Sequence, residues 1–207
     1  MVRRINGDAR RRELAEAVWR LVRRDGLAAA SVRAVAAESG LSAGSVRHFF
    51  GTQSELIAFA MRELIDAVRV RVAEAAQEED PVRRSTAVLV ELLPLTEASH
   101  AEASAHLQLA TQSRFDPALT DLADESFAGI RRVCRAALDW LDEAGEVRDD
   151  VDLDVATTAL CALVDGLAFE LVLAPRLLTA DRAREALRDH LSSLSDPTVS
   201  SEQRSSS

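Results

Sequence analysis

Apolar residues recur along most of this chain at helical spacing, and this periodicity limits the possible fold more than any other feature. Leu14, Ala17, Val18, Leu21 and Val22 stand at positions i, i+3, i+4, i+7 and i+8, which places them on one face of a helix. No run of strict alternation, the pattern of a half-buried strand, competes with this spacing. The sequence therefore predicts an all-α protein.

Two short helices are predicted to follow the first one. Ser31 is expected to cap a helix over residues 31–39, which Gly40 ends, and Ser42 is expected to cap a helix over residues 42–50. Serine suits these positions because its hydroxyl accepts a hydrogen bond from a backbone N–H of the first turn.

A long helix is predicted over residues 52–79. Thr52 and Glu55 have the spacing of a capping box, and the Asp80-Pro81 pair breaks the helix. Caps and breakers beyond it predict five more helices, which gives nine helices and no sheet. These five are expected near residues 82–93, 96–114, 116–144, 152–174 and 179–194.

Length and composition predict a soluble, cytoplasmic protein. The 207 residues suffice for one large domain or two small ones, and 47% of them are hydrophobic. The chain start lacks the apolar segment of a signal peptide, and the strongly apolar run over residues 155–164 is too short to cross a membrane. The polar tail over residues 196–207 is expected to be disordered.

The net charge is unevenly distributed along the chain. Residues 1–50 carry ten Arg against five acidic residues, whereas residues 51–207 carry a net charge of −14. This pattern is expected when only the N-terminal part approaches a polyanion, although it is also compatible with a solvated surface.

The stretch from Ser31 to Phe50 has the residues that a helix-turn-helix requires. This motif needs a small residue where its helices cross, a residue that tolerates left-handed backbone in the turn, and a buried apolar residue on the second helix. Ala36, Gly40 and Val46 stand four and six residues apart in these roles. Together with the basic local charge, the segment predicts binding to double-stranded DNA.

Here the chain resembles the TetR family of transcriptional regulators, over roughly residues 8–60. The match is specific in Gly40-Leu-Ser-Ala-Gly-Ser-Val-Arg-His-Phe-Phe50 and in Thr52-Gln-Ser-Glu-Leu56. The C-terminal part, which contains Val164-Asp-Gly-Leu167, is similar to the family more loosely.

The resemblance implies a division into domains and a way of binding DNA. Residues 1–50 would form the helix-turn-helix domain and residues 51–195 the ligand-binding and dimerisation domain, with a linking helix over residues 52–79. Two copies would pair through helices 152–174 and 179–194, and each would place its second short helix in a major groove of operator DNA. A small-molecule effector would shift the population between two arrangements of the DNA-binding domains.

The resemblance also implies which residues contact DNA. They are expected at the starts of the two short helices, on the exposed side of the second one and at the entry to the long helix. The set is Ser31, Arg33, Ser42, Ala43, Gly44, Ser45, Arg47, His48, Thr52 and Gln53.

Three positions depart from the usual family pattern. Arg47 stands where the family commonly has Tyr, Phe49 where many members have His, and Gln53 where Lys is common. The last two changes should weaken non-specific affinity for DNA, and an N-terminal arm of Arg3, Arg4 and residues 10–12 is expected to compensate.

A ligand pocket is the family expectation for the C-terminal helices. Large apolar residues and a few polar tips are its candidate lining, and these residues could equally fill the core. The candidates are Leu92, His106, Leu109, Gln112, Phe127, Trp140, Leu163 and Phe169.

Other classes of function find less support in the sequence. Glu97 and His100 form one Glu-x-x-His motif, followed by Glu102 and His106, but a di-iron bundle needs two such motifs. No catalytic motif and no cofactor loop is present, so no enzyme activity, metal or cofactor is predicted. The interpretation is a ligand-responsive dimeric repressor. The alternatives are an activator of the same build, a metal-binding helical-bundle enzyme and a helical adaptor.

Overall fold

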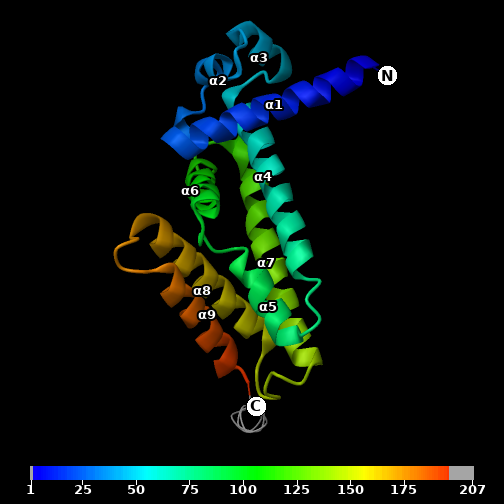
Figure 1. Cartoon of the computed structure of the whole chain (residues 1–207), viewed down its shortest axis with the longest axis vertical. Helices are drawn as coiled ribbons and strands as arrows, with labels where there is room; N and C mark the ends of the chain where they lie inside the picture. Colours follow the sequence, from blue (N-terminus) through cyan, green and yellow to red (C-terminus); the bar gives the residue numbers. More distant parts are fainter. Residues whose placement is uncertain (1, 196–207) are drawn as a thin grey trace. The chain divides into compact units, whose positions relative to one another are not determined.

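The computed structural model describes the backbone of residues 2–195 and the side chains of residue 7 and residues 9–195. Within that range the regular elements are helices and none is a strand, which confirms the predicted all-α architecture with nine α-helices. They are α1 (Val2–Asp25), α2 (Val32–Ser39), α3 (Ala43–Phe49), α4 (Gln53–Ala75), α5 (Pro81–Val90), α6 (Glu97–Gln112), α7 (Thr120–Glu143), α8 (Leu153–Leu173) and α9 (Ala180–Ser193) (Figure 1). Two short 3-10 helices, η1 (Leu27–Ala29) and η2 (Pro117–Leu119), precede α2 and α7.

Side chains begin several of these helices where the sequence predicts caps. The side-chain oxygens of Ser31, Ser42, Asp152 and Thr179 accept hydrogen bonds from backbone N–H groups two or three residues further on. Each such cap satisfies a donor that has no partner within the helix, and contributes about 1 kcal/mol.

One compact unit combines two separate stretches of the chain. This head unit contains residues 2–67 and 97–126. Its core is built from the apolar stripe of α1, including Leu14 and Val18, together with Ala36 and Val46 of α2 and α3. α6, η2 and the start of α7 contribute to the same core, with Ala105, Leu109, Leu119, Leu122 and Ala123.

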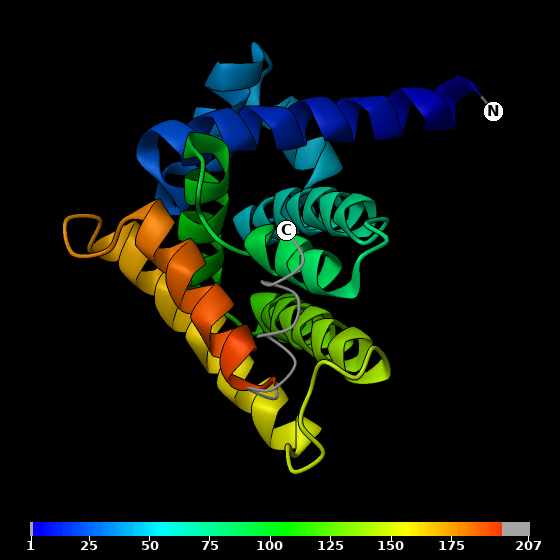
Figure 2. The same ribbon diagram turned by 60° about the horizontal axis from the view of Figure 1, so that its bottom comes forward.

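This grouping differs from the predicted boundary at residue 50. α6 packs against α1 and η1, so the segment 97–126 is compact with the N-terminal helices rather than with the remaining C-terminal ones. Figures 1 and 2 both show α6 beside the C-terminal end of α1. The assignment of DNA binding to residues 1–50 and of ligand binding to residues 51–195 stays a prediction.

The second compact unit contains the remaining helices. This body unit, residues 68–96 and 127–195, has a core of leucines from α5, α7, α8 and α9, such as Leu89, Leu138, Leu160 and Leu187. α8 and α9 run side by side in Figures 1 and 2. The buried Ser85 hydroxyl donates to the carbonyl of Ala137 at 2.8 Å, which joins α5 to α7.

The long helix ends earlier than predicted. α4 stops at Ala75 instead of Glu79. The guanidinium of Arg84 donates to the carbonyls of Glu78 at 2.7 Å and Glu79 at 2.9 Å. These carbonyls therefore have a side-chain donor and need no further helical turn to satisfy them.

α8 is longer than the strongly apolar run over residues 155–164. With 21 residues and a mean hydropathy of 1.8 over its most apolar stretch, it is long and apolar enough to cross a membrane. Helices in the core of water-soluble proteins pass the same test, so length and composition alone do not place α8 in a bilayer. The predicted tail, residues 196–207, lies outside the described residues.

Candidate nucleic-acid interface

The turn between α2 and α3 has the backbone that a helix-turn-helix requires. Gly40 adopts a left-handed conformation, with φ 70° and ψ 19°, directly after α2. The next N–H, that of Leu41, donates to the carbonyl of Ala36 at 2.9 Å and closes the helix end. Ala36 and Val46 are buried, which fixes the crossing of the two helices as the sequence predicts.

The two helix starts carry the predicted serines. Ser31 Oγ accepts from the Ala34 N–H at 3.2 Å, and Ser42 Oγ accepts from the Ser45 N–H at 3.0 Å. The hydroxyls of Ser42 and Ser45 also lie 2.9 Å apart. A serine that caps a helix with its oxygen can still donate its hydroxyl hydrogen, so Ser31 can bond a phosphate without losing its cap.

The solvent-facing side of α3 consists of few residues. Gly44, Arg47 and His48 are exposed, whereas Ala43 and Ser45 are half-buried, and Ala43 packs against the core of the head unit. Because Gly44 has no side chain, a partner can approach the backbone of α3 closely there. Of Ala43, Gly44 and Ser45, which are all in the expected DNA-contacting set, Gly44 is therefore the most accessible.

Two arginines of α2 and α3 carry charge that is not neutralised nearby. Among the described side chains, Arg33 and Arg47 are exposed and form no ion pair. By contrast, Arg20 and Arg24 of α1 bind the carboxylate of Glu38 with N–O distances of 2.9 and 3.2 Å, and they hold the pKa of Glu38 below its usual value. These pairs join α1 to α2.

The entry to α4 is capped in a way that differs in one bond from the expected capping box. Thr52 Oγ1 accepts from the Glu55 N–H at 3.1 Å, as predicted. The Glu55 carboxylate accepts from the N–H of Gly51 at 2.8 Å, one residue before the position that the motif usually uses. Thr52 and Gln53 are both exposed at this helix start.

The predicted flexible arm lies in helical backbone. α1 begins at Val2, so residues 10–12 belong to an ordinary helix, and Arg10 pairs with Glu13 at 2.6 Å. The helix continues through Asn6, Gly7 and Asp8, which are weak helix formers, so helix propensity alone does not predict this extension. The side chains of Arg3 and Arg4 lie outside the described residues.

The candidate ligand residues are divided between the two units. His106, Leu109 and Gln112 belong to the head unit, where Leu109 is fully buried in the core. The others, Leu92, Phe127, Trp140, Leu163 and Phe169, belong to the body unit. Phe127 and Phe169 keep 44% and 52% of their surface exposed, so they are not enclosed within the described chain.

Two of these residues already have polar or charged neighbours. The hydroxyl of Ser126 lies 3.1 Å from Nδ1 of His106, and burial lowers the pKa of this imidazole, which favours its neutral form. The guanidinium of Arg84 lies 5.3 Å from the ring centre of Trp140, a cation–π arrangement. One face of the Trp140 ring is thus already covered by a cation of the chain itself.

The alternative metal site gains no support from the geometry. In the described part of the chain, no three His, Cys, Asp or Glu side chains are grouped so that they could hold a metal ion, and Glu97, His100, Glu102 and His106 form no such cluster. The two free cysteines lie in the body unit, and burial strongly raises the pKa of Cys134.

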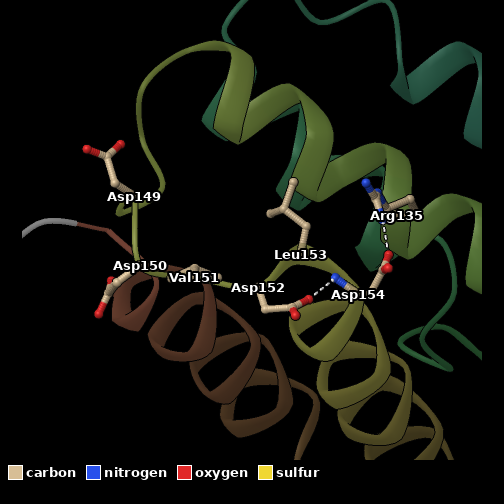
Figure 3. A pocket seen from close by; sticks show the side chains of 7 residues that line it. All are labelled: Arg135, Asp149, Asp150, Val151, Asp152, Leu153 and Asp154. Carbon is tan, nitrogen blue, oxygen red and sulfur yellow. Dashed lines mark hydrogen bonds and ion pairs between the residues drawn. The ribbon is translucent and has the colours of Figure 1, made fainter.

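An open hollow of about 420 Å³ lies where α7 faces the start of α8 (Figure 3). Arg135 bonds Asp139 and Asp154 there, and Asp152 caps α8. Figure 3 shows Asp149 and Asp150 pointing away from these bonds. Four of the seven residues that line the hollow are aspartates, and none of the seven is a candidate ligand residue.

α8 presents small and apolar residues to solvent along one side. Val155, Ala159, Ala162, Gly166, Phe169 and Leu173 are exposed at spacings of three and four residues. The expectation that α9 also pairs with its copy stays a prediction. Ala183, Leu187 and Leu191 are buried within the body unit, because the apolar stripe of α9 packs on its own chain.

In comparisons with known proteins, the chain is similar to transcriptional regulators. Residues 81–196 match the family model described as "BetI-type transcriptional repressor, C-terminal". The HTH-type transcriptional regulator PksA of Bacillus subtilis is 33% identical over 195 residues, which cover 94% of each chain.

Solved structures agree with this match. The crystal structure of a transcriptional regulator from Rhodococcus is 32% identical, with a TM-score of 0.77 over 89% of this chain and 95% of that one. A regulator from Saccharomonospora viridis, solved in complex with choline, is 26% identical, with a TM-score of 0.80 over 88% of this chain and 95% of that one.

Proposed function

The chain belongs to the TetR family of DNA-binding transcriptional regulators, and from this premise we propose that it is a homodimeric, cytoplasmic repressor that a small molecule releases from its operator. It acts by binding rather than by catalysis. The observation that carries the proposal is the exposed side of α3, which combines an accessible backbone at Gly44 with the unpaired charge of Arg47.

The charge arrangement supports this use of α2 and α3. Several arginines of α1 are paired with acids of the head unit, whereas Arg33 and Arg47 are not. Arginine binds phosphate oxygens and can also bond guanine through two N–H groups, so Arg47 suits either contact in a major groove. The serine caps at the starts of α2 and α3 add hydroxyl and backbone donors for phosphates.

The exposed side of α8 supports pairing of two copies. Small residues such as Ala162 and Gly166 allow two helices to approach closely, and Phe169 and Leu173 add apolar area. A continuous exposed apolar stripe is the surface expected of a permanent interface. Two paired copies would present two α3 helices to successive major grooves.

The effector is proposed only as a small molecule. The regulator from Saccharomonospora viridis is described with choline bound, so choline is a reasonable first compound to test. In this chain, however, Arg84 covers the ring of Trp140, and a ligand cation would compete with that guanidinium for the ring.

The test is fluorescence anisotropy of the full chain with duplex DNA from upstream of its own gene. A scrambled duplex serves as the control, and the salt concentration is varied. We expect tight, salt-sensitive binding that prefers the native duplex. Weak binding that does not distinguish the duplexes, or its absence even at low salt, would contradict the proposal.

The Arg47→Ala variant makes the test specific to α3. It should weaken binding and reduce the slope of log affinity against log salt by about 1 if Arg47 contacts a phosphate. Arg176→Ala is the matched control, because Arg176 is also exposed but lies in the body unit between α8 and α9. An equal loss of affinity in both variants would remove Arg47 from the interface.

A further inference from the structure

A side chain of α6 bonds the backbone just after α1, 81 residues away in the sequence. Gln108 Oε1 accepts from the N–H of Leu27 at 2.8 Å. The other end of the same amide, Nε2, lies 3.3 Å from Ser104 Oγ one turn earlier in α6. The Gln108 amide is therefore held at both ends, and its oxygen faces the chain between α1 and α2.

The bond satisfies a donor that η1 leaves without a partner. Gly26 precedes η1 and, having no side chain, cannot cap it. Leu27 is fully buried, and a buried N–H without an acceptor costs about 1–3 kcal/mol. Gln108 thus caps η1 from another helix.

The backbone conformation of Gly26 allows this contact. Its φ of 82° is one that residues with a side chain rarely adopt. A Cβ at this position would lie 3.5 Å from Gln108 Oε1 and 3.6 Å from Nε2. The backbone of the connector therefore passes directly against the glutamine amide.

A second hydrogen bond, also made by a residue within 97–126, fixes the chain that follows the helix-turn-helix. The hydroxyl of Ser54, in the first turn of α4, donates to Asp116 Oδ2 at 2.5 Å. The connector at Leu27 precedes α2, and Ser54 follows α3. The two hydrogen bonds from residues 97–126 thus bracket the whole helix-turn-helix.

We propose that Gln108 is a positioning residue for DNA binding: its amide fixes the connector η1 and so holds α2 and α3 in the orientation that binds DNA, without contacting DNA itself. This inference rests on the proposed function, in which α3 enters the major groove. It means that the orientation of α2 and α3 also depends on a residue of α6, which lies outside the helix-turn-helix motif.

The test compares two substitutions of Gln108 in the full chain. Gln108→Leu is close to isosteric and removes the acceptor, whereas Gln108→Glu retains an oxygen acceptor for the Leu27 N–H. Thr111→Val and Thr111→Glu are matched controls on α6, because the Thr111 hydroxyl bonds only the carbonyl of Leu107 in its own helix. Operator affinity, its salt dependence and amide hydrogen exchange at Leu27 are measured for each.

We expect Gln108→Leu to weaken operator binding about three- to tenfold, the effect of one hydrogen bond. The salt slope should stay unchanged, since no phosphate contact is removed. Amide exchange at Leu27 should become faster, and Gln108→Glu should restore affinity to that of the charge-matched Thr111→Glu.

Three outcomes would overturn the inference. Gln108→Leu could bind the operator as tightly as the unchanged protein, its salt slope could fall, or Gln108→Glu could fail to restore affinity. Failure of the unchanged chain to bind any duplex would instead refute the proposed function, and the inference would fall with it. Hydrogen exchange at Leu27 would still report whether Gln108 makes the bond.

Discussion

Gly40 and Gly44 lie four residues apart and have different roles: Gly40 allows the turn, and Gly44 allows close approach to the backbone of α3. Gly40 is needed for its backbone, since its φ of 70° is unfavourable for any residue with a Cβ, although a Cβ there would meet no atom within 4 Å. Gly44 has ordinary helical backbone, and a Cβ there would lie 3.7 Å from Ser42 Oγ, a normal contact. Stability and recognition can therefore be separated at these two positions.

Gly40→Ala should lower the free energy of unfolding by about 1–2 kcal/mol, because alanine is strained in the left-handed region. Gly44→Ala should raise it by less than about 1 kcal/mol, because alanine has the higher helix propensity and Gly44 lies in the first turn of α3. The same substitution at Gly44 should weaken operator binding by adding a methyl group where the backbone approaches DNA. Urea unfolding and anisotropy measure both, and an unchanged midpoint for Gly40→Ala would contradict the turn.

His106 makes stability depend on pH. Burial lowers its pKa, so the unfolded chain binds a proton at higher pH than the folded chain does. The free energy of unfolding should therefore fall as the pH drops through the unfolded histidine value of about 6.5, and level off below the folded pKa.

The measurement for His106 is urea unfolding at about pH 7.5 and about pH 5.5, on either side of the unfolded value. His106→Gln should lose less stability between these two conditions than the unchanged chain. His190, whose pKa burial also lowers, is present in both proteins and cancels in the difference. An identical pH dependence in the two proteins would show that His106 is not buried in its neutral form.

At the scale of helices, the starts were predictable because capping is local. Ser31, Ser42 and Thr179 each bond an N–H three residues further on, so the cap and its partner lie within one short stretch of sequence. The face of α9 was not predictable in the same way. Its periodicity shows that Leu187 is buried, but not whether its own chain or a second copy covers it.

Pairing through α8 gives a prediction at this scale. Ala162→Arg should convert a dimer, of about twice the 22.5 kDa chain mass, into a monomer, because a long charged side chain prevents close helix packing. Ala144→Arg is the matched control, since Ala144 is also exposed but follows α7. Sedimentation equilibrium distinguishes the two states, and a dimer that survives Ala162→Arg would exclude this side of α8.

At the scale of the whole molecule, the sequence indicated the helix-turn-helix but not its dependence on α6. Ala36, Gly40 and Val46 lie within eleven residues, and their roles follow from helix geometry alone. The contact of Gln108 with Leu27 spans 81 residues, and no local pattern marks it. The same holds for the bond between Ser54 and Asp116, which lie 62 residues apart.

The head unit predicts how fragments of the chain behave. A fragment of residues 1–80 lacks Leu109, Leu119 and Leu122 of the head core, so it should not unfold cooperatively. A fragment of residues 1–130 contains both stretches of the head unit and should do so. Urea unfolding followed by circular dichroism compares them, and a cooperative transition in the shorter fragment would contradict the prediction.

This discontinuous head also limits how such regulators can be recombined. A chimera that joins residues 1–50 of this protein to the sensing part of another regulator would replace Ala105, Leu109, Leu119 and Leu122 with foreign residues. It would thereby change the core residues that support α1, α2 and α3. A chimera that carries residues 97–126 along with the N-terminal segment keeps this core intact, so exchange of DNA specificity in this protein requires two transferred segments rather than one.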